Sequence, residues 1–539
     1  MDSSYYNTLH FSTIRPHDKV GFYRGLKNCS DFTKGYAGPA CTEPFDKYSQ
    51  ACRRADIINL ITAENTEFFM DIIFKLREEY RKFIDIHRDE MTEATREMRD
   101  DIEHSALNFR DEINGKPLAI PRLFSMEMKR QFDELTETTY GILKKVIKEY
   151  LEHEDYRRMF PFSKETEELI LLSDDPVSLL PLARFDIFYH EDTGEFKFCE
   201  INADGSSGMN ADRIMADMMI HNPAHQEMMY RYYMHNMELF DTWVDTFLSM
   251  YEEYRQRDVH PLNNKESDSL ETADMSASTG SVNADTPNVA IVDFLDIGRV
   301  REFEEFVRRF QKKGANCEIC DIRDLKYENG VLYSAKGRRV DAIYRRAVTT
   351  EIIDRLGEVE DFIRAVKERS VFLAGEFCTH VIDNKWTFYV LHHERTARFL
   401  TEKEREFIKN HIPGTFPLNE KGIDKAVVLG NKDDYILKPW DGYAAHGVKA
   451  GLECSQAEWE AFVSEVYGTD YICQEFAKQY DSYNIDFMFN EGKWMDYSHM
   501  TGLFVYNGRF SGVIARSAPA GGIIDYYRDE RRQPTFFVE

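Results

Sequence analysis

The chain has 539 residues, of which 42% are hydrophobic and 13% aromatic. It is long enough for about three or four domains, each with a core of its own. The formal net charge of -27 argues against a protein that binds nucleic acid through a basic face, and also against binding to an anionic membrane surface. We therefore expect partners that are small molecules or peptides, with no nucleic acid and no membrane among them.

The N-terminal residues contain no basic segment followed by an apolar one, so we predict no signal peptide. Long apolar runs of the kind that span a bilayer are missing from the sequence as well. The nine cysteines have irregular spacings, and only Cys317 and Cys320 form a C-x-x-C motif. Since no second pair or histidine cluster accompanies this motif, a zinc site is disfavoured. We expect reduced, structural cysteines in a soluble, cytoplasmic protein.

The first part of the chain has a helical pattern. Apolar residues recur at three- and four-residue intervals from Ala55 to about Asn114, and a second run covers Met126 to Leu151. This spacing places the apolar side chains on one face of a helix. We predict a helix-rich N-terminal region over residues 1–165.

The next segment, residues 166–257, begins with a hairpin signal. Leu182 to Asn202 is rich in Phe, Ile and Tyr, and Glu191 to Gly194 supply turn residues in its middle. A Met-rich stretch from Ala211 to Tyr254 is predicted to be helical. Residues 258–287 are polar and small, and they lack the apolar surface that folding requires. We interpret them as a flexible linker or a long loop.

Strands and helices alternate after this linker, which predicts a small doubly wound α/β domain at residues 288–370. The predicted elements are strands at Asn288–Asp293, Cys317–Asp321 and Asp341–Arg345 and a helix at Val300–Lys313. The remaining segment, residues 371–539, mixes helices with short strands.

Polar residues alternate with apolar ones along the predicted hairpin. Arg184 and Asp186 share one strand face, and Glu200 and Asn202 share a face of the other strand. With a turn centred near Thr193, the two polar pairs lie opposite each other. Converging Asp, Glu and Asn oxygens suit a hard cation such as Mg²⁺. A half-exposed strand with a charged wet face has the same pattern, so the hairpin alone leaves both interpretations open.

A second candidate site follows a strand that ends in Lys438. Gly442 and Gly447 lie in the loop after it. A lysine at a strand end beside a glycine loop is able to grip nucleotide phosphates, although the P-loop motif does not occur in this sequence. An ordinary hairpin with two glycines is the alternative.

Three further residues stand near strand ends or short polar motifs. Lys385 is a second lysine, Gln474 ends an apolar strand, and Arg516 closes another strand. Gln474 could offer hydrogen bonds to an adenine edge. Each of these signals is weak when taken alone.

Taken together and in this order, the motifs resemble the synthetase domain of glutathionylspermidine synthase and its relatives, the circularly permuted ATP-grasp ligases. The matching pieces are Arg184-x-Asp186, Glu200-x-Asn202, Asp341 to Arg346, Asn384-Lys385, Lys438-Pro439 with Gly442 to Gly447, Tyr471 to Gln474, and Gly512 to Arg516. They span residues 180 to 520. One departure concerns the loop after Lys438-Pro439, which in the family usually reads G-R-E-G.

The resemblance implies an α/β (α+β) fold of the ATP-grasp type, in which residues 166–257 and 371–539 form the ATP-grasp segments. It implies that Asp186, Glu200 and Asn202 bind magnesium and that Arg184 stabilises an acyl-phosphate stage. The ATP-binding residues implied by the family are Lys385, Lys438, Gly442, Gly447, Gln474 and Arg516. The resemblance does not identify the carboxylate and amine substrates of such an enzyme.

The function implied by the family is that of an ATP- and Mg²⁺-dependent ligase, which joins a carboxylate and an amine into an amide. In such an enzyme the side chains mainly position reactants and neutralise phosphate charge. Two alternatives stay open at this point. One is a nucleotide-binding scaffold that acts through a partner, to which the altered glycine loop points. The other is a small-molecule kinase that uses the same ATP site.

Overall fold

The computed structural model describes residues 72–105, 116–173, 175, 177–257, 286–296, 300–442, 446–521, 523–524 and 529–539. Residues 258–285 of the predicted linker, 55–71 and 106–114 of the first predicted helical run, and 443–445 of the glycine loop lie outside these residues.

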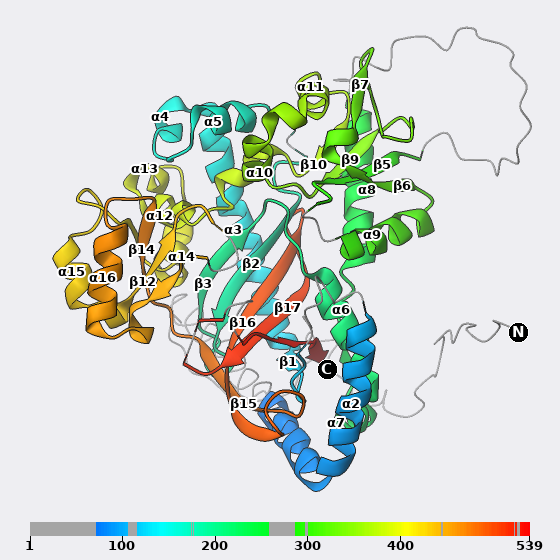
Figure 1. Ribbon diagram of the computed structural model, residues 1–539, viewed down its shortest axis with the longest axis vertical. Coiled ribbons are helices and arrows are strands. Elements are labelled where there is room, and N and C mark those ends of the chain that lie inside the picture. The colour runs from blue at the N-terminus through cyan, green and yellow to red at the C-terminus, as the bar shows by residue number, and fades with distance from the viewer. Residues whose placement is uncertain are drawn as a thin grey trace, which may run out of the picture. The chain divides into compact units, whose positions relative to one another are not determined.

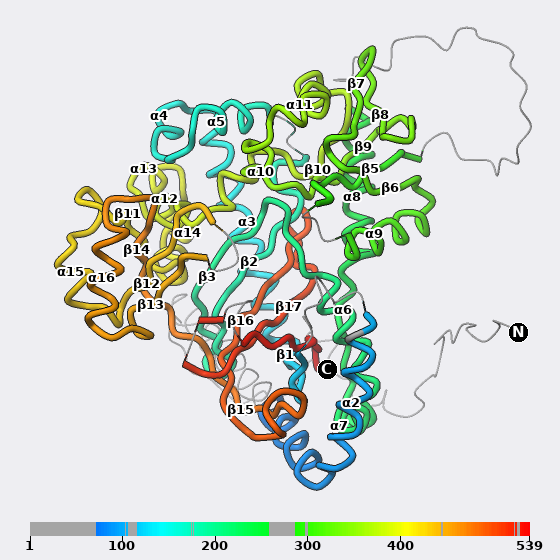
Figure 2. Tube along the Cα trace, in the orientation of Figure 1, coloured from blue at the N-terminus to red at the C-terminus, as the bar shows by residue number. Residues whose placement is uncertain are grey.

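A six-stranded antiparallel sheet organises the middle of the fold. Its order is β18–β17–β16–β2–β3, and β15 pairs with β16. The strands are β2 Leu182–Tyr189, β3 Phe196–Asn202, β15 Tyr480–Asp486, β16 Lys493–Tyr506, β17 Arg509–Pro519 and β18 Arg531–Gln533. Figures 1 and 2 show β2 and β3 beside β16 and β17, although almost 300 residues separate the two pairs along the chain.

One face of this sheet is apolar because its side chains alternate. Phe185 and Ile187 on β2 and Phe198 and Ile201 on β3 are buried. Phe198 and Ile201 are three residues apart and would point to opposite faces of a regular strand. A β-bulge resolves the conflict, since Ile187 pairs with Phe198 whereas Asp186 pairs with Glu200.

Helix α3, Met126–Glu152, packs against the apolar face. Its buried residues recur every three or four positions and belong to the same core cluster as the β2 and β3 side chains. Ser125 caps its first turn by accepting a hydrogen bond from the backbone N–H of Met128. The helix predicted for this segment is confirmed. Nearby helical elements are residues 72–86, α2 Arg88–His104, α4 Glu154–Arg157 and α5 Lys164–Ile170.

The helical stretch predicted from Ala211 to Tyr254 is confirmed for most of its length, but it is divided into three α-helices, a 3-10 helix at Met219–His221 and a short strand. The α-helices and the strand are α6 Met209–Met218, α7 Pro223–Arg231, β4 Met234–His235 and α8 Phe240–Gln256. Pro223 has no backbone N–H, so a new helix begins there with Asn222 as its cap. Strand β4 joins a three-stranded sheet, β1–β19–β4, with β1 Arg122–Ser125 and β19 Thr535–Val538.

The alternating elements after the predicted linker form a parallel sheet. Its order is β10–β9–β5–β6, and the strands are β5 Asn288–Asp293, β6 Asn316–Asp321, β9 Ala342–Arg345 and β10 Phe372–Ala374. Helices α8, α9 (Val300–Lys312), α10 (Thr349–Asp354) and α11 (Glu360–Lys367) accompany it. The three predicted strands and the predicted helix are confirmed here. Cys317 and Cys320 lie on β6 as buried free thiols.

Another four-stranded sheet, β11–β14–β12–β13, lies in the C-terminal part of the chain. Its strands are β11 Thr415–Pro417, β12 Tyr435–Pro439, β13 Lys449–Ala450 and β14 Tyr471–Glu475. Its helices include α12 Trp386–His392, α14 Glu402–His411, α15 Lys425–Gly430 and α16 Gln456–Val466. Trp459 of α16 is fully buried against β12 and β14 residues, and its indole N–H donates to Val428 of α15.

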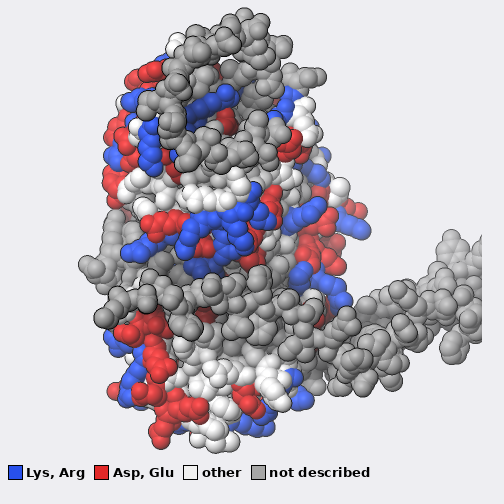
Figure 3. Space-filling view, turned by 90° about the vertical axis from the view of Figure 1, so that its right-hand side faces the viewer, with Lys and Arg blue, Asp and Glu red and all other residues white. Residues whose placement is uncertain are grey.

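Surface charges of both signs are mixed on the face shown in Figure 3, where basic and acidic side chains lie next to one another. Ion pairs between α8 and the segment formed by α9 and Lys313 are of this kind, with Arg309 3.0 Å from Asp241 and Lys313 2.6 Å from Asp245. Within the described residues, every helix is too short or too polar to cross a lipid bilayer.

Candidate functional site

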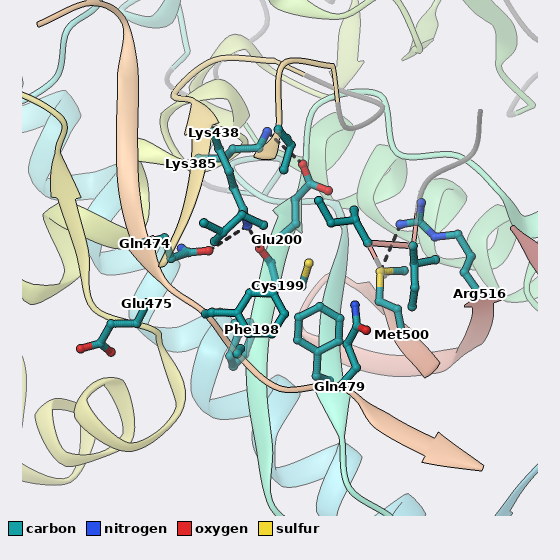
Figure 4. A pocket seen from close by; sticks show the side chains of 17 residues that line it. Phe198, Cys199, Glu200, Lys385, Lys438, Gln474, Glu475, Gln479, Met500 and Arg516 are labelled. Atoms are coloured by element: carbon teal, nitrogen blue, oxygen red, sulfur yellow. Dashed lines mark hydrogen bonds and ion pairs between the residues drawn. The ribbon is translucent and has the colours of Figure 1, made fainter. Parts of the chain in front are cut away.

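A cavity lies between the six-stranded sheet and the β11–β14–β12–β13 sheet, and its empty space, including its open mouth, is about 900 Å³. Figure 4 shows Lys438 and Gln474 on one side of it, Arg516 and Met500 on the other, and Cys199 between them. Five residues that the sequence singles out therefore line one space, although they come from widely separated positions. They are Glu200, Lys385, Lys438, Gln474 and Arg516.

The polar pairs of the hairpin lie opposite each other, as predicted. Arg184 pairs with Asn202 and Asp186 pairs with Glu200 in the register of β2 and β3. These two pairs are centred on Thr193, where the sequence placed the turn, whereas the pairs beyond the bulge are shifted by half a residue. These four side chains therefore lie together at the end of the hairpin that is remote from its turn, facing away from α3.

Asp186 is fully buried beneath two arginines. Arg184 donates to both of its carboxylate oxygens, at 2.7 and 2.9 Å, and Arg516 donates to Oδ2 at 2.9 Å. Asn202 Nδ2 also donates to Oδ2, at 3.1 Å. Burial alone raises the pKa of Asp186, but these donors offset it and leave the pKa below its ordinary value. Asp186 is consequently an anion at neutral pH.

Lys385 connects the hairpin to the glycine loop. Its Nζ lies 3.3 Å from Glu200 Oε1 and donates to the backbone carbonyl of Gly442. The lysine side chain is 11% exposed, so its charge acts in a partly desolvated place. Lys385 and Glu200 thus lie at one edge of the cavity, where an anionic group entering it would meet the ammonium.

Lys438 on β12 and Gln474 on β14 form a buried pair in the wall of the cavity. Lys438 Nζ donates to Gln474 Oε1 at 2.8 Å, and Gln474 Nε2 donates to Thr415 Oγ1 at 2.9 Å. Burial lowers the pKa of Lys438. This chain of hydrogen bonds fixes the amide of Gln474, with its oxygen toward the lysine.

The two predicted glycines lie beside the cavity and are not among its lining residues. Gly442 contributes its carbonyl to Lys385. Gly447 packs so closely on Tyr471 that an added Cβ would lie 2.6 Å from the tyrosine hydroxyl. Val448, the next residue, does line the cavity.

The loop after Asn202 packs against two later segments of the chain. Asp383, two residues before Lys385, accepts hydrogen bonds from the backbone N–H groups of Ala203 and Asp204. Gly205 has φ +75°, and a Cβ there would lie 2.6 Å from the Arg346 carbonyl. The small residue therefore permits close backbone packing within the protein.

Asp204, His380 and Asp383 bring their ligand atoms within 4.8 Å of one another, an arrangement that could hold a metal ion. Asp204 already accepts hydrogen bonds from Arg345, Thr379 and the backbone of Thr349. Burial raises the pKa of Asp204, yet Arg345 and His380 lower it further than burial raises it. These contacts show that the Asp204 carboxylate binds the loop after Asn202 to neighbouring elements.

Apolar side chains complete the cavity, and the sequence had not singled them out. Phe188, Ile436, Phe476 and Met500 all line it. Two of them were predictable from the sequence, because side chains two residues apart share a strand face. Phe188 lies two residues after Asp186, and Ile436 lies two residues before Lys438. Met500 had none, since its place depends on pairing with Arg516 across β16 and β17.

The hairpin residues offer the oxygen ligands that magnesium prefers. The Asp186 and Glu200 carboxylates and the Asn202 amide lie on paired positions of adjacent strands. Glu200 has Lys385 as its ion-pair partner at 3.3 Å and borders the cavity. The chemistry of this set fits a hard cation, provided that one of the donors on Asp186 moves.

No family model matches the sequence, and no curated protein does so either. Among solved structures, the glutathione synthetase-like effector GSS30 from Globodera pallida, in its apo form, is 12% identical over 83% of this chain and 96% of that chain, with a TM-score of 0.51. A putative gamma-glutamylcysteine synthetase from Methylobacillus flagellatus is 10% identical over 75% of this chain and 86% of that one, with a TM-score of 0.36. The first likeness shows that this mixed α/β chain shares its fold with a glutathione synthetase-like protein.

Proposed function

We propose that the chain is an ATP- and Mg²⁺-dependent carboxylate–amine ligase with a circularly permuted ATP-grasp fold. The observation that carries the proposal is the cavity, where Glu200, Lys385, Lys438, Gln474 and Arg516 converge. Three cations and a carboxylate around an apolar-walled space suit a molecule with a flat apolar part and a polyanionic part.

Each residue has a role in nucleotide binding under this proposal. Lys385 and Lys438 neutralise phosphate charge, and Gln474 faces the base with an amide that its partners hold in place. The apolar walls at Phe188 and Ile436 exclude water from the base. Desolvation strengthens the attraction between the lysines and the phosphates.

Asp186, Glu200 and Asn202 would hold the magnesium. When bound, magnesium would neutralise phosphate charge and polarise the reacting phosphoryl group. Arg184, which is held by Asp186 and by the carbonyl of Ser207, keeps a fixed positive charge at the end of the hairpin that is remote from its turn. A fixed cation of this kind stabilises charge that develops during transfer of a phosphoryl group to a carboxylate.

The amide-forming half of the proposal has separate support. One solved structure that shares this fold belongs to a protein described as a glutathione synthetase-like effector. The order of the motifs from Arg184 to Arg516 resembles a family of amide-forming ligases. In the proposed reaction, ATP phosphorylates a carboxylate, and an amine then displaces phosphate to give the amide.

A coupled assay of ADP release tests this function. The full-length chain is supplied with ATP, Mg²⁺ and pairs of carboxylates and amines drawn from amino acids, peptides, thiols and polyamines. We expect ADP release that requires both an acid and an amine and is lost in Glu200→Gln and Asn202→Ala. Undiminished ADP release by either variant would show that the metal site is wrongly assigned.

Mass analysis of the product separates the ligase from a small-molecule kinase. A ligase yields an amide whose mass is the sum of acid and amine minus water. A kinase yields a stable phosphate ester and needs no amine. Nucleotide binding without turnover of any pair would favour the scaffold alternative.

A further inference from the structure

The carboxylate of Asp186 accepts four hydrogen bonds, three of them on one oxygen. Oδ1 accepts from Arg184 Nε, and Oδ2 accepts from Arg184 Nη2, Asn202 Nδ2 and Arg516 Nη2. A carboxylate offers about four lone-pair sites. Asp186 is also completely buried, so water cannot supply a further route to its oxygens. Since about two of the lone-pair sites belong to each oxygen, a new cation can reach Oδ2 only in exchange for one of its three donors.

Arg184 is the donor least able to leave. It binds both oxygens of Asp186 in a bidentate arrangement, and its Nη1 donates to the carbonyl of Ser207 at 2.6 Å. Its side chain is 11% exposed. Bidentate arginine–carboxylate pairs are strong and geometrically specific. Its removal would break three hydrogen bonds at once.

Arg516 is held much less firmly. Only its Nη2 contacts Asp186, at 2.9 Å, and the same nitrogen has a weak acceptor in the Met500 sulfur at 3.2 Å. Among the residues that the structure describes, the nearest carboxylate besides Asp186 is Glu530, at 3.8 Å. The Arg516 side chain is 20% exposed and lines the cavity, so it has space into which it can turn.

We propose that Arg516 acts as an exchangeable counter-cation, which must leave Asp186 before Oδ2 of this carboxylate can accept a divalent cation. This inference rests on the proposed function, because it takes Asp186, Glu200 and Asn202 to be the metal site. Arg516 then has two positions, one on Asp186 and one in the cavity, where its guanidinium can meet phosphate oxygens. Apparent affinity for the cation is reduced by the fraction of molecules in which Arg516 covers Asp186.

Binding of Mn²⁺ alone to the full-length chain, followed by electron paramagnetic resonance, tests the exchange without any turnover. Removal of the competing guanidinium in Arg516→Ala should tighten Mn²⁺ binding about tenfold, the effect expected when one charged hydrogen bond no longer competes. Arg516→Lys, which keeps a positive charge, should lie between the wild type and Arg516→Ala.

Arg532→Ala is the matched control. Arg532 lies directly across from Arg516 on β18, and its Nε contacts Glu530 at 2.8 Å. Its loss removes the same charge from the neighbouring strand, so a general electrostatic effect would appear in both variants. We expect much less tightening in Arg532→Ala than in Arg516→Ala. Equal tightening in the two would overturn the exchange. Thermal unfolding checks that both variants are folded.

Glu200→Gln separates this inference from the proposed function. If Mn²⁺ binding is lost in Glu200→Gln but is unchanged in Arg516→Ala, the metal site stands and the exchange by Arg516 is wrong. If wild type, Glu200→Gln and Arg516→Ala all bind Mn²⁺ equally, or none of them binds it, the hairpin is not the metal site and both proposals fail.

Discussion

Lys438 Nζ and Gln474 Oε1 lie 2.8 Å apart on neighbouring antiparallel strands, β12 and β14, inside the wall of the cavity. Lys438 is only 7% exposed, and a neutral amide oxygen is its hydrogen-bond partner at this distance. Its positive charge is therefore left available to an incoming anion, which a carboxylate in the same place would prevent.

Gln474→Glu tests this relationship. The new carboxylate would raise the pKa of Lys438 and neutralise the field that attracts phosphates. We expect ATP binding, measured by calorimetry, to weaken about tenfold or more, since charged hydrogen bonds contribute roughly 1.5–3 kcal/mol. Gln479→Glu adds the same charge to the cavity lining away from this contact. If the two variants weaken binding equally, total charge and not the Lys438 contact is responsible.

Gly502 on β16 allows Asp186 to take its position. The two residues are directly paired, and a Cβ on Gly502 would lie 2.7 Å from Asp186 Oδ1 and 2.8 Å from Ile514 Cγ2. Gly502→Ala should therefore displace the Asp186 carboxylate and reduce Mn²⁺ affinity about tenfold, by analogy with other changes that misplace ligands of a metal.

Gly430→Ala is the control for this change, because a Cβ at Gly430 meets nothing within 4 Å. Mn²⁺ titration of both variants by electron paramagnetic resonance is the measurement. Wild-type affinity in Gly502→Ala would mean that Asp186 does not contribute to the metal site.

Local patterns were sufficient to predict much of the secondary structure. They also predicted that the two polar pairs of the hairpin lie opposite each other. The β2–β3 register follows from a turn at Thr193, so Arg184 and Asn202 were predictable partners. The bulge at Cys199 was not predictable in this way. The sequence contains one indication of the bulge. Phe198 and Ile201 are both apolar, but residues three apart cannot lie on the same face of a regular strand.

Contacts between distant segments had no local signal. Strand β16 separates β2 from β17 in the sheet, and only this order brings Arg516 onto Asp186. A strand that ends in arginine says nothing about its neighbour in the sheet. The clamp of Asp383 on the backbone after Asn202 likewise joins segments about 180 residues apart. Such pairings depend on tertiary packing, which periodicity within one segment cannot reveal.

Glu191, in the turn of the β2–β3 hairpin, is fully buried between two arginines. Its carboxylate oxygens lie 2.5 Å from Arg122 and 2.5 Å from Arg77. Burial lowers the pKa of Arg122 to about 10, and Glu191 opposes this effect. Glu191→Gln would leave two poorly compensated cations in the interior. We expect a loss of about 3–5 kcal/mol in the free energy of unfolding.

Urea unfolding followed by circular dichroism measures this loss. Asp192→Asn, at the exposed neighbouring position, is the control and should change stability by less than about 0.5 kcal/mol. Equal stability of the two variants would show that the Arg77–Glu191–Arg122 group contributes little to the fold.

Glu376 follows β10 and is buried, with its Oε1 accepting a hydrogen bond from Ser178 at 3.2 Å. Burial, and after it the charge of Asp175, raises the pKa of Glu376 to about 8. The folded state therefore holds this proton more tightly than the unfolded state, in which the pKa is about 4.3. The resulting contribution to stability is complete below about pH 4 and disappears as the pH rises through about 8.

Glu376→Gln should remove this dependence, because the amide is neutral at every pH and resembles the protonated acid. We compare the free energy of unfolding of the variant with that of the wild type at each pH. We expect this difference to shift in favour of the variant by more than about 1 kcal/mol between pH 5 and pH 9. Urea unfolding at both pH values measures the change, with the exposed Glu406→Gln as the matched control. A constant difference between Glu376→Gln and wild type at the two pH values would mean that Glu376 is ionised in the folded protein, with its charge stabilised by neighbours that outweigh its burial.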